Sequence, residues 1–333
     1  MLKRFLSIFQ YVFFLGGGLF LVWWQLNSMT AIEKKEFYNS LKNVNYWIAI
    51  PILLMSIASH ISRSMRWQIL MEPLGYQPKL KNVFSVTMIG YLINTAVPRL
   101  GEVVKCTLLA KHEKLRADKL IGTIIIERTF DLICYLLFIC VTVLIQIDKV
   151  GSYAKEKIDD MSRSSGMPVW LEIIIIGVII TLFIFLIKFL FKKYPDNKLI
   201  LKINNIVKGI AEGFRTIKKI KNRKAFLLHT GFIWLMYLSQ IYIGFKSMEG
   251  IDHLGIQAAF SVLSLATLSM ILTPGGIGSF PIFVMQTLSI YTIAAPLGKA
   301  FGWLMWGVST GIVLMVGLIC LVALPYINRE KSV

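Results

Sequence analysis

The chain is poor in the residues that build metal sites and disulfide frameworks. It has four cysteines and four histidines among 333 residues. No two histidines have the helical spacing of a zinc motif, and the cysteines lie in or beside apolar segments without metal-ligand spacing. We therefore expect no metal site, no cofactor and no disulfide framework.

Acidic residues are scarce as well. The 18 Asp and Glu residues stand against 36 Lys and Arg residues, which gives a formal net charge of +18. A strongly basic chain can bind nucleic acid. Here, however, the basic residues gather beside apolar stretches, as they do in cytoplasmic loops that face anionic lipid. We therefore predict membrane phospholipids with anionic headgroups as partners, and no nucleic acid.

Long polar stretches are few, and apolar residues dominate. Hydrophobic residues make up 56% of the chain, charged residues only 16%, and the mean hydropathy is +0.67. These values lie outside the range of soluble domains. The composition predicts an all-α polytopic membrane protein. A spanning helix needs about 20 largely apolar residues, and six segments satisfy this requirement: residues 5–24, 46–67, 120–147, 169–191, 225–245 and 300–324.

Two further apolar segments are too short to cross a bilayer. Residues 83–97 end at a break over residues 98–101, and residues 256–273 end at a break over residues 274–278. Both breaks begin with proline and contain glycine, and a second apolar stretch follows each. We therefore predict two re-entrant helical hairpins, each of which enters and leaves on one side. Such non-helical backbone is tolerated at membrane depth only where protein buries it or where it lines a cavity.

The two short segments belong to a longer repeat. Both contain Phe-Ser-Val, at 84–86 and 260–262, and are followed by a proline, and the two prolines, Pro98 and Pro274, are 176 residues apart. The second and third spans begin at residues 46 and 120. Adding 176 to these positions gives 222 and 296, close to the starts of the fifth and sixth spans at 225 and 300. Each half then has three spans and one hairpin, and because three is odd, the halves have opposite orientations. We predict an inverted repeat over residues 1–168 and 169–333, the common plan of alternating-access transporters with a central site.

The distribution of basic residues predicts the orientation. Eight Lys and Arg residues lie in the region 79–119 and eleven in the region 192–224, and cytoplasmic loops are rich in these residues. Arg63 and Arg66, at the end of the second span, are counted on the same side. Both termini are therefore predicted to be cytoplasmic. Residues 195–224 carry apolar residues at helical spacing and predict an amphipathic interfacial helix, with a solvated connector as the alternative.

Three charged residues, Glu127, Arg128 and Asp131, lie inside the third span. At a rise of about 1.5 Å per residue they are roughly 10 to 17 Å from its start. A charged residue at the centre of a spanning helix costs about 2.5–3.5 kcal/mol, so these side chains must face protein or water. Glu127 and Asp131 are four residues apart and share a helix face.

The first break adds Arg99, Glu102 and Lys105. Backbone amides at the start of the helix after the break point towards it, and a helix N-terminus beside Arg and Lys suits an anion such as phosphate. We predict a polar cavity in which Arg99, Lys105 and Arg128 meet a lipid headgroup. The neighbouring acids would orient these cations, bind a cation or accept a proton. The alternative is a structural ion-pair network that locks the hairpin to the third span.

The second break has a different chemistry. It offers the glycines Gly275, Gly276 and Gly278 in place of charges, and the last span carries no charged residue. We predict that these glycines contribute flexible backbone, with bare amides near the apolar or neutral part of the substrate. Close packing is the alternative role for them.

Four motifs occur in order along the chain: Arg66-Trp67, Pro-Arg-Leu-Gly-Glu at 98–102, Glu-Arg-x-x-Asp at 127–131 and Pro-Gly-Gly-Ile-Gly at 274–278. In these motifs the chain resembles the lysylphosphatidylglycerol synthase transmembrane family. This flippase-like domain is found alone or fused to an aminoacyl-phospholipid synthase in the multiple peptide resistance factor. The resemblance implies an inner-membrane protein that moves phospholipids or related lipid-linked substrates between leaflets. It places these residues in the polar core: Arg99, Glu102, Glu127, Arg128 and Asp131.

The chain departs from the family pattern in one place. The glycine-rich second break usually leads to a glutamate three residues beyond the last glycine, where this chain has Pro281. The chain therefore has no acid at that place for a cation or proton role. The sequence also has no synthase domain after its last predicted span, so we do not expect it to aminoacylate lipid.

We expect a flippase-like lipid translocase that moves a phospholipid or an aminoacylated phospholipid between the leaflets of the bacterial cytoplasmic (inner) membrane. One alternative is a transporter of a polyprenyl phosphate or a glycolipid. Another is a membrane-embedded lipid-modifying enzyme. The chain has no metal-binding acidic motif, histidine pair or serine elbow, so a transporter is favoured over an enzyme. A homo-oligomer and a separate lipid-modifying synthase remain open as partners.

Overall fold

The computed structural model describes residues 16–97, 99–146, 171, 174 and 220–329. These residues belong to two compact units, Met1–Arg128 with Lys218–Val333 and Thr129–Ile217, which we describe separately. Several predicted features lie outside the described residues. They are the start of the first span (5–15), nearly all of the fourth span (169–191), most of the amphipathic segment (195–224) and the boundary between the predicted repeats at 168/169.

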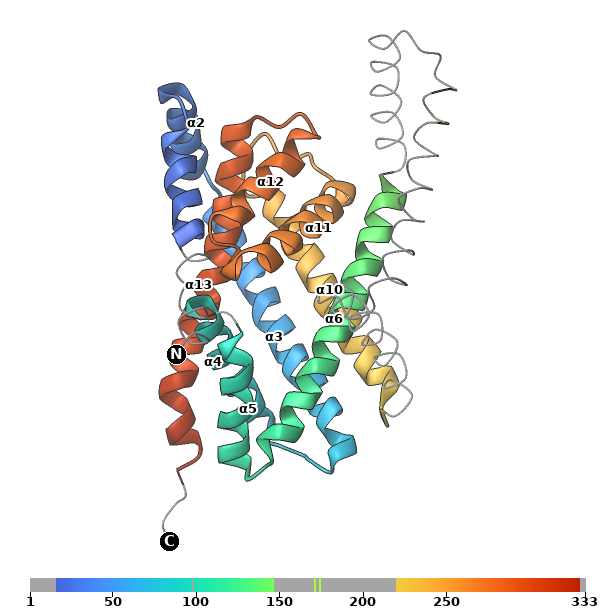
Figure 1. The fold of residues 1–333 in the computed structure, drawn as a ribbon. Helices are drawn as coiled ribbons and strands as arrows, with labels where there is room; N and C mark the ends of the chain where they lie inside the picture. The colour runs from blue at the N-terminus through green and yellow to red at the C-terminus, as the bar shows by residue number, and fades with distance from the viewer. Residues whose placement is uncertain (1–15, 98, 147–170, 172–173, 175–219, 330–333) are drawn as a thin grey trace, which may run out of the picture. The chain divides into compact units, whose positions relative to one another are not determined.

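In the described parts of the chain, regular structure is helical and no residue is in a β-strand. Residues 16–27 are helical. The described residues also include three short 3₁₀ turns: η1 (Tyr46–Ile48), η2 (Glu72–Leu74) and η3 (Pro274–Gly276). The α-helices, shown in Figure 1, are α2 (Ala31–Lys42), α3 (Ala49–Met71), α4 (Leu80–Ala96), α5 (Leu100–Glu113), α6 (Ala117–Ile145), α10 (Arg223–Phe245), α11 (Ile256–Leu272), α12 (Ser279–Ser289) and α13 (Ala295–Ile327).

Among the residues that the structure describes, four helical stretches are long and apolar enough to cross a membrane. They are Tyr46–Leu74, Ala117–Ile145, Arg223–Phe245 and Ala295–Ile327. Each overlaps one of the spans predicted from hydropathy, namely the second, third, fifth and sixth. The protein is therefore a helical membrane protein, as its composition predicted.

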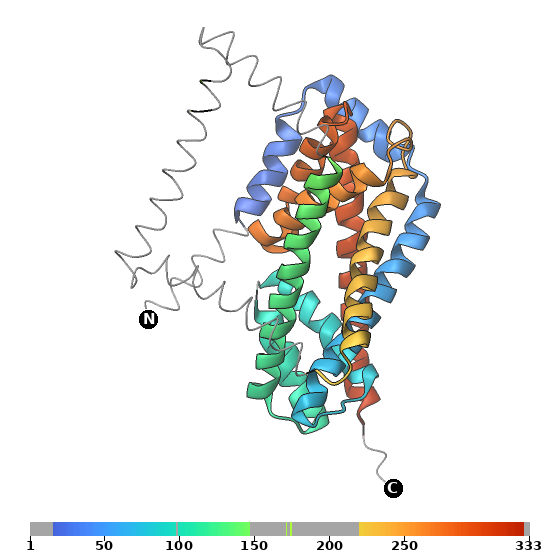
Figure 2. The same cartoon turned by 90° about the vertical axis from the view of Figure 1, so that its right-hand side faces the viewer.

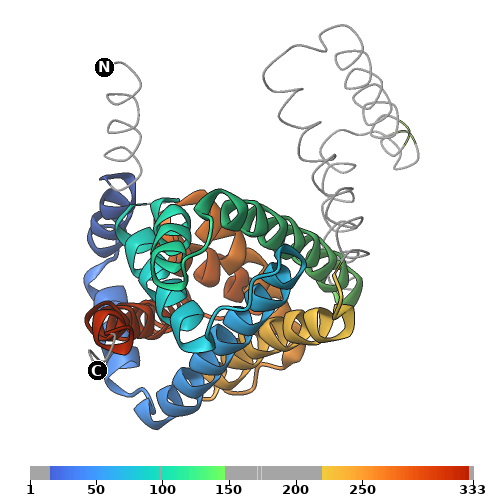
Figure 3. The same cartoon turned by 90° about the horizontal axis from the view of Figure 1, so that it is seen from below.

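The first break joins two helices that pack against each other. Helix α4 ends at Ala96 and α5 begins at Leu100, and the two lie side by side next to α3 (Figure 3). The backbone nitrogen of Gly101 donates a hydrogen bond of 2.8 Å to Oδ1 of Asn94. A Cβ atom on Gly101 would lie only 1.9 Å from the carbonyl oxygen of Gly90. Two glycines, Gly90 and Gly101, therefore permit the close approach of α4 and α5.

The second break has the same helix–break–helix form. Helix α11 ends at Leu272, η3 follows, and α12 begins at Ser279 and packs against α11. Helices α4 and α11 each contain 17 residues, and their first residues, Leu80 and Ile256, are 176 positions apart. Helices α3 and α10 each contain 23 residues. The order of long helix, shorter helix, break, short helix and long helix thus occurs twice along the chain.

Helices α3 and α10 pack along each other (Figure 2). Their contact contains small and polar side chains: Ser59 is fully buried and Thr230 is 4% exposed. Small residues at helix interfaces let the backbones approach closely. This pair of helices forms one wall of the site described below.

The packing at Gly101 leads to a stability prediction. Gly101→Ala should lower the thermal unfolding midpoint in detergent micelles by several degrees, because the new methyl group meets a backbone oxygen that cannot rotate away. Gly122→Ala is the matched control. Gly122 is also helical, and a Cβ there has no atom within 4 Å, so alanine should raise stability by about 0.5–1 kcal/mol. A Gly101→Ala protein as stable as the control variant would contradict the close approach.

Candidate functional site

The site is centred on Glu127, whose side chain is fully buried. Glu127 is ten residues into α6, about 15 Å along the helix. It shares a buried helix face with Leu120, Thr123 and Ile124, because these positions recur at intervals of three and four residues. The sequence pattern of α6 therefore turns this carboxylate towards protein.

Three cations surround the carboxylate. Arg63 Nη1 and Arg66 Nη2 each lie 3.4 Å from Oε1, and Lys105 Nζ lies 3.3 Å from Oε2. All three side chains are nearly or fully buried, at 9%, 0% and 3% exposed respectively. The two arginines come from α3 and the lysine from α5. We call these four residues the Glu127 cluster.

Neighbouring side chains hold the two arginines. Arg66 Nη1 donates to Oγ1 of Thr230 at 3.3 Å, and Arg63 Nη2 donates to the Tyr237 hydroxyl at 3.2 Å. The Arg66 guanidinium also lies 5.7 Å from the centre of the Phe226 ring, a cation–π distance. All three partners are on α10, so α10 orients the cations that α3 supplies.

Lys105 packs against an indole that has its own hydrogen bond. Its Nζ lies 4.3 Å from the centre of the Trp67 ring. Trp67 is 1% exposed and donates from Nε1 to Oγ1 of Thr123 at 2.8 Å. The fixed indole therefore gives the lysine a second favourable contact beside Glu127.

A second ion pair continues the cluster towards the surface. Arg128 Nε lies 3.6 Å from Glu102 Oε1, and Arg128 Nη2 lies 3.9 Å from Oε1 of Glu127. These side chains are more open, with 40% of Arg128 and 29% of Glu102 exposed. The site thus has a fully buried inner part and a half-exposed outer part, which we call the outer pair.

Cations outnumber acids in this site. The Glu127 cluster and the outer pair together contain four cations and two acids. A positive site of this kind suits an anion, and arginine in particular suits phosphate.

The structure places three predicted site residues with Glu127, namely Glu102, Lys105 and Arg128. Arg99 lies just before α5 with a left-handed φ of 68°, and its side chain is exposed. Within the described residues, Arg99 has no ion pair with the Glu127 cluster. Asp131 is half-buried and belongs to the second compact unit, so its part in the site stays a prediction.

The glycines of the second break have left-handed φ angles of 60° at Gly275, 72° at Gly276 and 73° at Gly278. The carbonyl oxygen of Gly275 accepts from Trp306 Nε1 at 2.8 Å, and that of Gly278 accepts from Gln25 Nε2 at 2.6 Å. A Cβ on Gly278 would lie 2.7 Å from the backbone oxygen of Gly18. This break is therefore closely packed at Gly278, and the carbonyls of Gly275 and Gly278 accept hydrogen bonds. A role for its amides in substrate binding stays a prediction.

Sequence reasoning did not assign Arg63 and Arg66 to the site. It counted them with the cytoplasmic charges because they fall at the end of an apolar segment. The structure extends α3 to Met71, so both arginines lie within the helix and are buried. Their spacing of three residues was the available signal, since it puts two cations on one face of an apolar helix.

The fold and the site define the chain as a helical membrane protein with a buried, predominantly cationic ion cluster. The family described as the lysylphosphatidylglycerol synthase TM region matches residues 7–317, and the chain belongs to that family. The chain is also 22% identical over 297 residues to the UPF0104 membrane protein of Methanocaldococcus jannaschii, a match that covers 83% of this chain and 84% of the relative. No solved structure matches the chain. Family membership confirms the resemblance seen in the four motifs.

The burial of Glu127 leads to a second stability prediction. Glu127→Gln keeps the shape of the side chain but leaves three buried cations without their shared negative charge. Removing one partner of a buried ion pair costs about 3–5 kcal/mol, and we expect a loss of this order in the free energy of unfolding, measured in detergent micelles. Glu102→Gln is the control. Its pair is partly exposed, and the loss should be about 0–1 kcal/mol. Equal losses of unfolding free energy in Glu127→Gln and Glu102→Gln would contradict the conclusion that Glu127 is the acid that stabilises the buried cations.

Proposed function

We propose that this protein is a flippase-like lipid translocase, which moves a phospholipid or an aminoacylated phospholipid between the leaflets of a bacterial cytoplasmic membrane. Family membership supports a lipid-related role, because the matching region is the flippase-like transmembrane part. The observation that carries the proposal is the Glu127 cluster, in which α3 and α5 hold three buried cations around one acid. Such a group suits the phosphate of a headgroup while the acyl chains stay in the bilayer.

The inner and outer parts of the site have different roles in this proposal. Arg128 and Glu102 are half-exposed, so a headgroup reaches them first. Arg63, Arg66 and Lys105 then take the phosphate, and its negative charge replaces part of the field that Glu127 provides in the empty site. Glu127 keeps the three cations in place when no substrate is bound. Arg99, Asp131 and the glycines of the second break complete the proposed substrate path.

The proposed path through the membrane follows from the repeated helix order. We propose six spanning helices and two re-entrant hairpins, α4–α5 and α11–α12, arranged as an inverted repeat of residues 1–168 and 169–333. The equal lengths of α4 and α11 and of α3 and α10 support this arrangement. Cytoplasmic termini are proposed from the loops rich in Lys and Arg. Movement of one repeat against the other would then alternate access to the site.

The proposal also covers enzymatic activity and binding partners. It moves lipid without changing it chemically. Membrane phospholipids are its partners, and a separate lipid-modifying synthase supplies the substrate where that substrate is aminoacylated. A homo-oligomer is compatible with the proposal and is not required by it.

The function is tested by reconstitution into liposomes with headgroup-labelled lipids. The wild-type protein should carry label to the opposite leaflet much faster than empty liposomes do. Lys105→Gln should slow this transfer at least tenfold, because it removes a cation that contacts Glu127, and Lys105→Arg should restore most of it. Arg116→Gln is the control: Arg116 forms an exposed ion pair with Asp118, and the rate should be unchanged.

The lipid panel in this experiment distinguishes the candidate substrates. It contains phosphatidylglycerol, an aminoacylated phosphatidylglycerol, a polyprenyl phosphate and a glycolipid. Faster transfer of the polyprenyl phosphate than of the phospholipids would favour the alternative transporter. Chemical change of any lipid would favour an enzyme. Transfer no faster than in empty liposomes for every lipid would refute translocation.

A further inference from the structure

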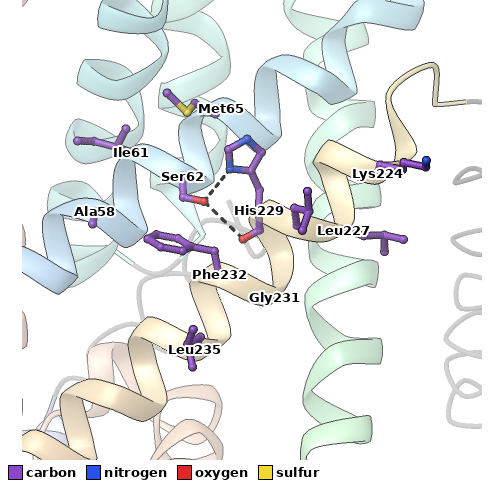
Figure 4. A pocket seen from close by; sticks show the side chains of 11 residues that line it. Ala58, Ile61, Ser62, Met65, Lys224, Leu227, His229, Gly231, Phe232 and Leu235 are labelled. Carbon is purple, nitrogen blue, oxygen red and sulfur yellow. Dashed lines mark hydrogen bonds between the residues drawn. The ribbon is translucent and has the colours of Figure 1, made fainter.

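A groove runs along the outer side of the contact between α3 and α10 (Figure 4). Its volume is about 1020 Å³. Apolar side chains from both helices line most of it, with Lys224 at one end and Leu235 at the other. The lining includes Ala58, Ile61 and Met65 on α3 and Leu227, Phe232 and Leu235 on α10.

The groove and the Glu127 cluster lie on different faces of the same two helices. On α3, Ser62 lines the groove while the next residue, Arg63, reaches Glu127. On α10, His229 lines the groove while the next residue, Thr230, contacts Arg66. The groove is therefore a separate surface from the inner site.

The polar groups in the groove wall bind each other. The Ser62 hydroxyl lies 2.9 Å from Nδ1 of His229 and 3.4 Å from the backbone oxygen of the same residue (Figure 4). The contact joins α3 to α10, so these polar atoms of Ser62 and His229 already have partners within the protein. The surface left for an occupant between Lys224 and Leu235 is chiefly apolar.

The length of the groove matches one leaflet of a membrane. Lys224 and Leu235 are eleven residues apart on α10, which is about 16 Å at a rise of 1.5 Å per residue. The hydrocarbon core of a bilayer is about 30 Å thick, so one leaflet contributes about 15 Å. Lys224 is in the first turn of α10, next to Arg223, where a headgroup would be expected. The positive end of the helix dipole adds to the attraction for an anion there.

We propose that this groove is a lateral binding site for an anionic phospholipid, with one acyl chain between α3 and α10 and the phosphate beside Lys224. The apolar lining matches the acyl chain, the length matches one leaflet, and the lysine complements the charge of the headgroup. The lipid covers the outer face of α3, which carries Arg63 and Arg66, and of α10, which orients them. Its binding does not depend on transport, so this proposal and the proposed function can fail separately.

The test fills the groove and, separately, removes its charge. A Cβ on Gly231, which lines the groove, has no atom within 4 Å, so Gly231→Phe occupies the acyl-chain position without a clash at Cβ. Dioleoyl phosphatidylglycerol and dioleoyl phosphatidylcholine, which differ only in headgroup, are titrated into purified protein and counted by native mass spectrometry. Gly231→Phe should weaken binding of both lipids more than tenfold. Gly122→Phe, the same change at another open helical glycine, should not.

Lys224→Gln tests the headgroup end. A lysine near an anionic lipid surface contributes about 1 kcal/mol, so this variant should reduce the preference for phosphatidylglycerol about fivefold and leave phosphatidylcholine binding unchanged. Lys119→Gln, at an exposed lysine on α6, should keep the preference. Unchanged binding in Gly231→Phe would overturn the site, and an unchanged preference in Lys224→Gln would overturn the assignment of the headgroup. Loss of a homo-oligomer in Gly231→Phe, with no lipid retained by the wild type, would assign the groove to a second copy of the chain.

Discussion

The first half of the structure depends on one buried charge. The carboxylate of Glu127 is out of water, and a charge in that position is stable only with close partners. Its partners, Arg63, Arg66 and Lys105, come from two other helices, and α10 orients the arginines. One acid on α6 therefore links that helix to α3 and α5 through ion pairs. The same arrangement concentrates positive charge among buried side chains of apolar helices.

The two halves of the chain follow a similar helical path but use different chemistry. Around the first break, charged side chains meet. Around the second, the packing involves backbone, since Trp306 and Gln25 donate to carbonyl oxygens of Gly275 and Gly278 and Gly278 lies close to Gly18. In the translocase that we propose, one half would recognise the headgroup. The other half would then act chiefly as a closely packed partner against which the first half moves.

Much of the fold was predictable from the sequence because its signals are strong. About 20 apolar residues in a row identify α3, α6, α10 and α13, and a proline followed by glycine marks both breaks. Lys105 and Glu127 were predicted to share a site because charges inside apolar segments need partners. Arg63 and Arg66 escaped prediction because a charge at the end of a hydrophobic segment has the same appearance whether it is buried or in a loop. The exposed position of Arg99 depends on a left-handed turn, which local sequence does not specify for an arginine.

The central claim is that the cations around Glu127 bind the phosphate of a lipid headgroup. An experimental structure of the protein in lipid nanodiscs, with dioleoyl phosphatidylglycerol bound, tests this claim most directly. The account predicts a headgroup phosphate within ion-pair distance, about 4 Å, of Lys105 Nζ or of the Arg63 or Arg66 guanidinium, with Glu127 displaced from at least one of these cations. A phosphate bound only elsewhere, with the Glu127 contacts intact, would contradict it.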